Sequence, residues 1–150
     1  ELDPAHAADF ENNRAALDQK LQELDQTFRD IVKTAKRKTI IVGDRFPFRY
    51  LTEEYGLEYY AAFPGCSAEV EPSASTVAFL IEKVKAEKIP IVFYIEFSTH
   101  KIADAIADAT GAKTMLLHSA HNVSQEDIDS GITYLNIMSE NAEKLREALN

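Results

Sequence analysis

The run Ile89–His100, with the letters IPIVFYIEFSTH, constrains the fold more than any other stretch of this chain. Its aliphatic and aromatic residues follow one another without polar alternation, which is typical of a strand buried on both faces of a parallel sheet. Pro90 stands at the start of this strand, where a missing N–H costs least. Glu96 places a carboxylate at the carboxyl end, which is the edge where open α/β sheets bind ligands.

Composition limits the kinds of partner that the chain can have. The 150 residues suffice for one domain with a core, and 45% of them are hydrophobic. The net charge of −9, without a stripe of Lys or Arg, makes nucleic acid and anionic membranes poor partners. The single Cys66 excludes an internal disulfide and a Cys-rich zinc site. No apolar run approaches the roughly 20 residues of a membrane span.

Short apolar strands alternate with helices along the chain. The strands are expected at Thr39–Val42, Leu57–Phe63, Ile91–Ile95 and Lys113–Leu117. Helices are expected over about 47–55, from Ser73, over about 99–110, and as one final helix after Ser124. Because this alternation produces right-handed crossovers, we expect an α/β fold, a three-layer sandwich around a four-stranded parallel sheet. The predicted strand order is 2-1-3-4.

A long helix precedes the first strand. Asp3 and Pro4 form a typical helix start. An apolar stripe then recurs at steps of four and three residues, and it consists of Leu17, Leu21, Leu24, Phe28 and Ile31. No Gly or Pro interrupts the segment before Lys38. We therefore expect a helix over about 1–37 that starts abruptly within the sequence, as a piece of a longer protein would.

Polar side chains follow the strands at the points where they end. Parallel strands all end on one edge and lie about 4.8 Å apart, so these side chains can meet in one cleft. They are Asp44, the loop with Cys66 and Glu69, Glu96, and His118 with His121 nearby. Two carboxylates and an imidazole suit Zn²⁺, and Mn²⁺ accepts the same donors with more oxygen. The predicted metal donors are Asp44, Glu96, His118 and His121.

Each predicted donor also has a simpler interpretation. Asp44 could cap the helix that starts at Pro47, and Glu96 could pair with Arg45 or accept loop N–H groups. His121 could be an exposed loop residue. The chain contains none of the common nucleotide-binding or acyl-transfer motifs. The convergence of the four strand ends is what favours a binding edge.

The residues also resemble a known family. The segments that carry the resemblance are D-P-A-H-A-A-D-F-E-N-N, G-D-R-F-P-F-R-Y-L-T-E-E-Y-G-L, A-E-V-E-P-S-A and I-P-I-V-F-Y-I-E-F-S. In order and spacing they are similar to the second half of zinc/manganese ABC-transporter substrate-binding proteins, over essentially the whole chain. The resemblance implies two α/β lobes joined by one rigid helix, with the metal between them. This chain is then expected to hold the linker helix, 1–37, and the carboxyl-terminal lobe, 38–150, without the amino-terminal lobe and its two histidine ligands.

The resemblance carries over to the predicted donors with substitutions. The third ligand of the family, usually His or Glu, lies just before the aromatic segment, where this chain has Gly43, Asp44 and Arg45. Asp44 is the best substitute there. The fourth ligand, usually Asp, follows the last strand, where His118 lies nearest. Glu96 matches an acid that more often supports the site than binds the metal.

The function that the resemblance implies is transport and not catalysis. The whole protein would capture Zn²⁺ or Mn²⁺ in the periplasm or outside the cell, anchored to the membrane as a lipoprotein, and deliver it to a permease. The helix turns around Ala8–Leu17 should then be poorly covered, or held by a second copy of the chain. Two other classes stay open: a metal-dependent hydrolase with Glu96 as base, and an interaction module with an acidic edge.

Overall fold

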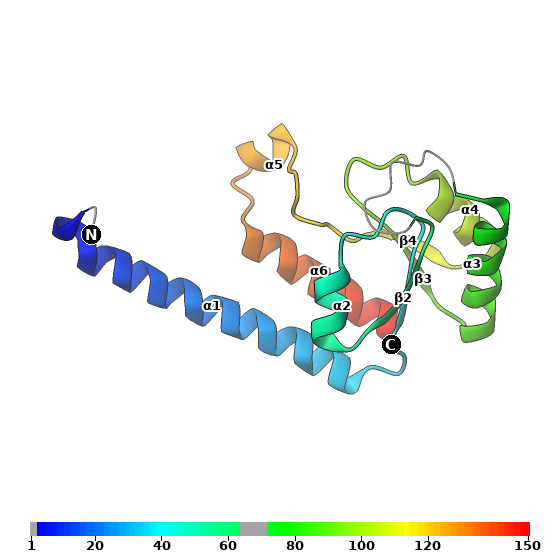
Figure 1. Ribbon diagram of the computed structural model, residues 1–150, viewed down its shortest axis with the longest axis horizontal. Coiled ribbons are helices and arrows are strands. Elements are labelled where there is room, and N and C mark those ends of the chain that lie inside the picture. Colours follow the sequence, from blue (N-terminus) through cyan, green and yellow to red (C-terminus); the bar gives the residue numbers. More distant parts are fainter. Residues whose placement is uncertain (1–2, 64–71) are drawn as a thin grey trace.

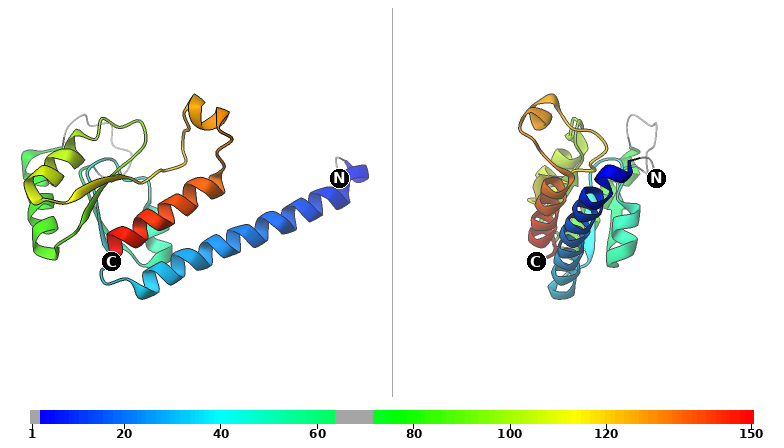
Figure 2. Two further views of the ribbon diagram at one scale, coloured as in Figure 1. Left: turned by 180° about the vertical axis from the view of Figure 1, so that it is seen from behind. Right: turned by 90° about the vertical axis from the view of Figure 1, so that its left-hand side faces the viewer.

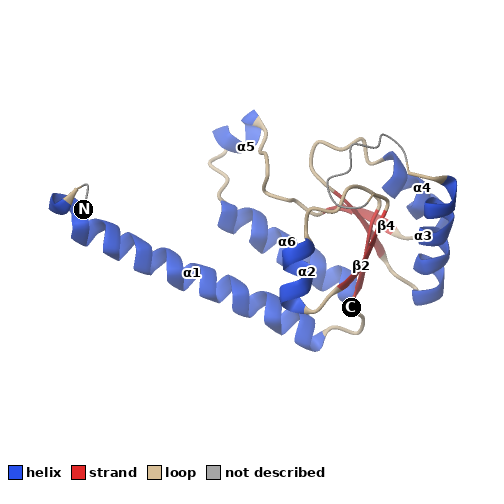
Figure 3. Ribbon diagram, viewed as in Figure 1, coloured by secondary structure: helices blue, strands red, loops and turns tan. Residues whose placement is uncertain are grey.

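The computed structural model describes residues 3–63 and 72–150, and its strands and helices alternate as expected (Figure 3). The helices are η1 (Pro4–His6, a 3-10 turn), α1 (Ala7–Thr34), α2 (Arg49–Tyr55), α3 (Ala74–Glu87), α4 (Lys101–Thr110), α5 (Gln125–Asp129) and α6 (Tyr134–Leu149). The strands are β1 (Thr39–Val42), β2 (Glu58–Ala61), β3 (Ile91–Tyr94) and β4 (Lys113–Leu116). They form one sheet in the order β2-β1-β3-β4, and every pair is parallel. The predicted fold class and strand order are confirmed.

Helices cover both faces of the sheet and make the three layers (Figure 1). Alternate residues of a strand point to opposite faces, and β1 divides accordingly. Ile40 and Val42 pack in the cluster with the end of α1, α2 and α6, whereas Ile41 packs in the cluster with α3 and α4. The central strands are buried on both sides, which explains why their sequence shows no polar alternation.

Only the carboxyl-terminal part of α1 is buried. The helix is unbroken from Ala7 to Thr34, and its buried residues are Phe28, Ile31 and Val32. Phe10 and Leu17 are 59% and 50% exposed, as expected for its first turns. Figures 1 and 2 show α1 extending away from the sheet well beyond the start of α6. Among residues 3–63 and 72–150, none of the helices combines the length and the hydrophobicity that a membrane span requires.

The last helical segment differs from the prediction. The predicted single final helix is wrong, because Gly131 lies in the left-handed region (φ 74°) and separates α5 from α6. A capping box of Ser124 and Asp127 starts α5, and a second box of Thr133 and Asn136 starts α6. The chain after β4 therefore turns twice before α6 returns to the sheet.

Candidate metal site

Glu96 and His118 lie side by side beyond the ends of β3 and β4. Glu96 follows β3 by two residues and His118 follows β4 by two residues, so the parallel pairing of these strands brings them together. The Oε2 atom of Glu96 lies 3.7 Å from Nδ1 of His118, and their side chains are only 10% and 12% exposed. The predicted convergence of strand ends is thus realised for these two residues.

Ser119 holds the carboxylate of Glu96 with two donors. Its backbone N–H donates to Oε2 at 2.8 Å, and its hydroxyl donates to Oε1. Burial raises the pKa of the Glu96 carboxyl, but the hydrogen bonds from Ser119 and the nearby His118 outweigh burial and hold this pKa below its usual value. Glu96 is therefore kept as a carboxylate, and the alternative that it accepts loop N–H groups is realised.

His118 is fixed at both its ring and its backbone. Its Nδ1 accepts the N–H of Ala120 at 2.9 Å, in a turn where Ala120 takes a positive φ of 61°. Its backbone N–H donates to Oδ1 of Asn141 at 2.9 Å, and its carbonyl accepts from Nδ2 of Asn141 at 2.8 Å. The imidazole is consequently held toward Glu96 by groups from the turn and from α6.

Asp44 is buried in a different environment. It is 5% exposed, its Oδ1 accepts the N–H of Arg45 at 2.8 Å, and its Oδ2 has no hydrogen-bond partner among the residues described. It does not cap α2, whose N-cap Phe48 has no side-chain cap bond. Asp44 lines a cavity of about 290 Å³ with the loop that leads into α4, including His100.

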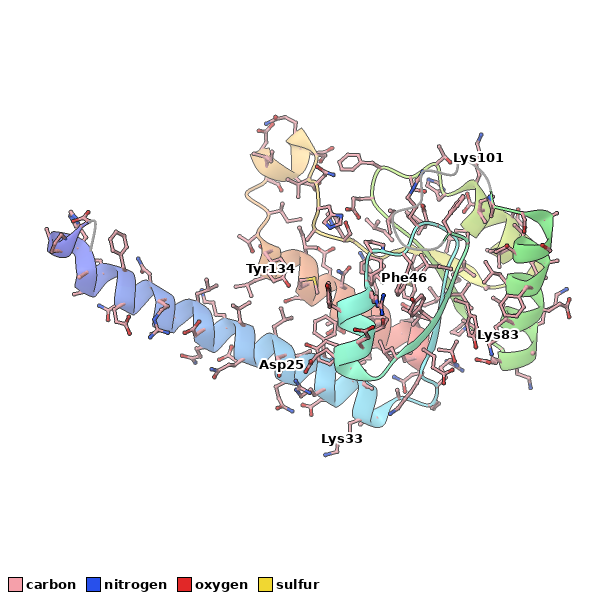
Figure 4. The ribbon with its side chains drawn as sticks, viewed as in Figure 1. Asp25, Lys33, Phe46, Lys83, Lys101 and Tyr134 are labelled. Carbon is pink, nitrogen blue, oxygen red and sulfur yellow. The ribbon has the colours of Figure 1, made fainter. Side chains whose placement is uncertain are left out.

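A second cavity, of about 460 Å³, lies next to His118. It is lined by His118 and Ser119, and by residues of α2 and α6 such as Tyr50, Tyr134 and Met138. Figure 4 shows Tyr134 at the start of α6. Asp44 does not line this cavity. Asp44 and His118, which the sequence predicts in one cleft, thus line two different cavities, and Glu96 lines neither of them.

The other predicted group, His121, lies on the exposed part of the same turn, where its backbone N–H donates to the hydroxyl of Ser119 at 3.2 Å. Cys66 and Glu69 lie outside the described residues. Within residues 3–63 and 72–150 no three His, Cys, Asp or Glu side chains gather as a metal cluster. Of the predicted metal ligands in the described part of the chain, Glu96 and His118 therefore form the one pair that the structure brings together.

The spacing of this pair fits two ligands of one metal ion. With Zn–N and Zn–O bonds of about 2.1 Å and a tetrahedral angle, two donors lie about 3.4 Å apart. The 3.7 Å between Oε2 of Glu96 and Nδ1 of His118 is too long for a hydrogen bond and close to that value. A bound ion would take the place of the Ala120 N–H at Nδ1, since that atom has a single lone pair.

Ser119 and Asn141 belong to this site but were not predicted from the sequence. No sequence pattern indicates the role of Ser119, because it depends on a turn that brings the N–H and the hydroxyl of Ser119 to Glu96. For Asn141 there is such a pattern: it stands three residues after Met138 and four before Leu145, on the apolar stripe of α6. A polar side chain on such a stripe indicates a buried hydrogen-bonding role.

Comparison of structures first identifies the class of protein. The chain is similar to the metal-dependent lipoprotein YcdH from Bacillus subtilis, with a TM-score of 0.83, 34% identity, and coverage of 99% of this chain and 55% of that one. It is also similar to the Zn(II)-bound ZnuA-like domain of Streptococcus pneumoniae AdcA, with a TM-score of 0.77, 32% identity, and coverage of 97% and 54%. The fold is that of metal-binding lipoproteins.

Comparison of sequences then identifies the family. The family described as "Zinc-uptake complex component A periplasmic" (ZnuA) matches residues 1–148. This chain belongs to that family. It is 34% identical over 147 residues to the high-affinity zinc uptake system protein ZnuA of Bacillus subtilis (strain 168). The aligned residues make up 98% of this chain and 46% of that protein. The chain thus spans about half the length of this relative.

Proposed function

We propose that this chain is the carboxyl-terminal lobe and linker helix of a substrate-binding protein that captures Zn²⁺ and delivers it to the permease of an ABC transporter. The observation that carries the proposal is the Glu96–His118 pair, whose facing donors lie 3.7 Å apart at the carboxyl edge of the sheet. The zinc-uptake family supports Zn²⁺ as the first candidate. Mn²⁺ is the second, because it accepts the same donors with more oxygen.

The remaining metal ligands come from a second lobe in this proposal. Two donors fill only half of a tetrahedral zinc shell. We assign residues 1–37 to the linker helix and 38–150 to this lobe, and the second lobe to a preceding part of the protein. The length of the relative and the exposure of Phe10 and Leu17 on α1 support this arrangement. A second copy of the chain is the alternative cover for those turns.

The proposed location is the periplasm or the outside of the cell, with the whole protein anchored to the membrane as a lipoprotein. The family is described as periplasmic, and the similar structure from Bacillus subtilis is described as a lipoprotein. The partners that we propose are the metal ion, the permease and the second lobe. We expect no nucleic-acid partner, because the net charge of −9 makes nucleic acid a poor one.

The proposed role is binding without catalysis. The relatives are described as uptake and binding proteins. In addition, both oxygens of Glu96 already accept hydrogen bonds from Ser119. A general base needs a pKa raised toward neutrality, whereas these hydrogen bonds favour the charged form of the carboxyl. The lowered pKa of Glu96 argues against the hydrolase alternative.

Titration calorimetry with Zn²⁺ on the chain and its variants tests the proposal. We expect weak binding by the chain alone, and its loss in Glu96→Ala and His118→Ala. Asp44→Asn and His121→Ala test the two other predicted donors, and we expect smaller losses because Asp44 borders a separate cavity and His121 is exposed. Equal binding by the wild type and His118→Ala would remove His118 from the site.

A further inference from the structure

Asn141 is completely buried on the core side of α6. Its neighbours on that stripe are apolar, with Leu145 buried one turn later and Met138 packed at the edge of the core. A buried amide is costly unless its donors and acceptor are paired. Since the helix does not need an amide at this position for packing, its hydrogen bonds are the feature to explain.

Both ends of the Asn141 amide bind one residue. Oδ1 accepts the backbone N–H of His118 at 2.9 Å, and Nδ2 donates to the carbonyl of His118 at 2.8 Å. The orientation of the amide is fixed, because only the oxygen can face an N–H and only the NH₂ group can face a carbonyl. These are the two backbone groups that an adjacent strand would otherwise pair.

The need for this pairing follows from where the sheet ends. Strand β4 ends at Leu116, and the last bond of the ladder runs from the Leu117 N–H to the Tyr94 carbonyl at 2.8 Å. His118 follows the last residue that pairs with β3. The side chain of Asn141 supplies the partners for the backbone N–H and the carbonyl of this residue, which carries the imidazole.

We propose that Asn141 is a positioning residue for the Glu96–His118 pair: it fixes the backbone of His118 and thereby directs the imidazole toward Glu96. The next two residues depend on the same anchor, because Ser119 binds Glu96 and the Ala120 N–H binds Nδ1 of His118. This inference rests on the proposed function for its effect on metal affinity. Its effect on the placement of His118 does not depend on metal.

The test separates positioning from packing with three variants. Asn141→Leu has nearly the same volume and removes both hydrogen bonds to His118, together with the longer one from Nδ2 to Sδ of Met138 at 3.5 Å. Asn141→Asp keeps an acceptor for the His118 N–H and loses the donor, and it gives a second result if Asn141→Leu fails to fold. Leu145→Ala is the matched control, since it weakens the same helix in the same core without touching His118.

Zn²⁺ affinity, measured by competition with a chelator, is the first readout. We expect Asn141→Leu to weaken binding about 10- to 100-fold, the usual effect of a residue that orients a metal ligand. Leu145→Ala should lower the melting temperature and leave affinity at the wild-type level. Wild-type affinity in folded Asn141→Leu, or an equal loss in Leu145→Ala, would overturn the proposal.

The NMR signal of the His118 ring, assigned by its absence from His118→Ala, is the second readout and needs no metal. We expect it to shift in both Asn141 variants and to stay in place in Leu145→Ala. If the wild-type chain bound no zinc, the proposed function would fail and this signal alone would decide the inference. An unchanged ring signal in Asn141→Leu would refute it.

Discussion

At the scale of single residues, Gly43 determines how closely α4 approaches the sheet. A Cβ atom at this position would lie 2.4 Å from the Cα of Ala103 and 2.6 Å from its backbone nitrogen. Both are backbone atoms of a helix, so they cannot move aside as the end of a side chain can. The absence of a side chain at Gly43 therefore permits α4 to pack directly against the end of β1, next to Asp44.

We predict that Gly43→Ala destabilises the chain by about 1–3 kcal/mol, the usual cost of overpacking a core. Ala103→Gly should not rescue it, because the two closest contacts are to backbone atoms that remain. Urea unfolding of the two single variants and the double variant measures the change in unfolding free energy. A Gly43→Ala variant as stable as the wild type, or one rescued by Ala103→Gly, would contradict the account.

The candidate site shows how far single residues could be predicted from the sequence. The rule that parallel strands end on one edge correctly predicted that Glu96 and His118 lie together, because their proximity depends only on strand order. The rule could not show that Asp44 borders another cavity, because that depends on the direction of the chain after Gly43. Asn141 is remote in sequence from His118, and only the packing of α6 on the sheet joins them.

At the scale of elements, a cluster of side chains fixes α1 on α2. The hydroxyl of Tyr55 donates to Asp25 at 3.0 Å, and Arg29 contacts both Asp25 and Glu54, at 2.8 and 2.6 Å. Phe28 stacks on the ring of Tyr55 with 5.0 Å between centroids. Figure 4 shows Asp25 on the part of α1 that lies beside α2. The direction of the projecting helix is therefore set at its carboxyl-terminal half.

Two phenylalanines of α1 should differ sharply when truncated. Phe28 is 2% exposed and Phe10 is 59% exposed. We predict that Phe28→Ala costs about 3–5 kcal/mol of unfolding free energy, the usual loss for a buried aromatic ring, and that Phe10→Ala changes it by at most about 0.5 kcal/mol. Chemical denaturation of the isolated chain compares the two. A comparable loss for both would show that the first turns are packed in solution.

Acid should weaken the same junction through Asp25. Hydrogen bonds from Arg29 and Tyr55 lower the pKa of the Asp25 carboxyl. A group with a lowered folded-state pKa stabilises the fold above its unfolded value, about 3.9, and loses that contribution as pH falls through the folded value. The stability difference between wild type and Asp25→Asn, measured from urea midpoints, should therefore have its largest value at about pH 6 and shrink below about pH 4. A difference that stays constant down to about pH 2.5 would contradict this.

The order of elements was predictable because it depends on periodicity and on strong stop signals such as Gly56 and Gly111, which end α2 and α4 in the left-handed region. The division of the last helix was not. Gly131 is a stop signal of the same kind, but the apolar stripe continues across it in the sequence, and the new start is marked by the second capping box at Thr133. Local hydrogen bonds outweighed periodicity there.

At the scale of the whole molecule, one side of the fold is left open. The first turns of α1, together with α5 and the start of α6, project to the same side beyond the sheet (Figures 1 and 2). Phe10, Leu17, Ile128 and Tyr134 on these elements are all at least half exposed. The cavity beside His118 borders Tyr134. We propose that the second lobe lies on this side, with the Glu96–His118 pair at its edge.

The most direct test of the account is the position of zinc in crystals of the zinc-loaded chain, located by anomalous diffraction at the zinc absorption edge. The account predicts a peak about 2.0–2.2 Å from both the Glu96 carboxylate and an imidazole nitrogen of His118. The peak should be absent from crystals of His118→Ala prepared in the same way. A zinc peak at Asp44 or on the surface, with none between Glu96 and His118, would contradict the account.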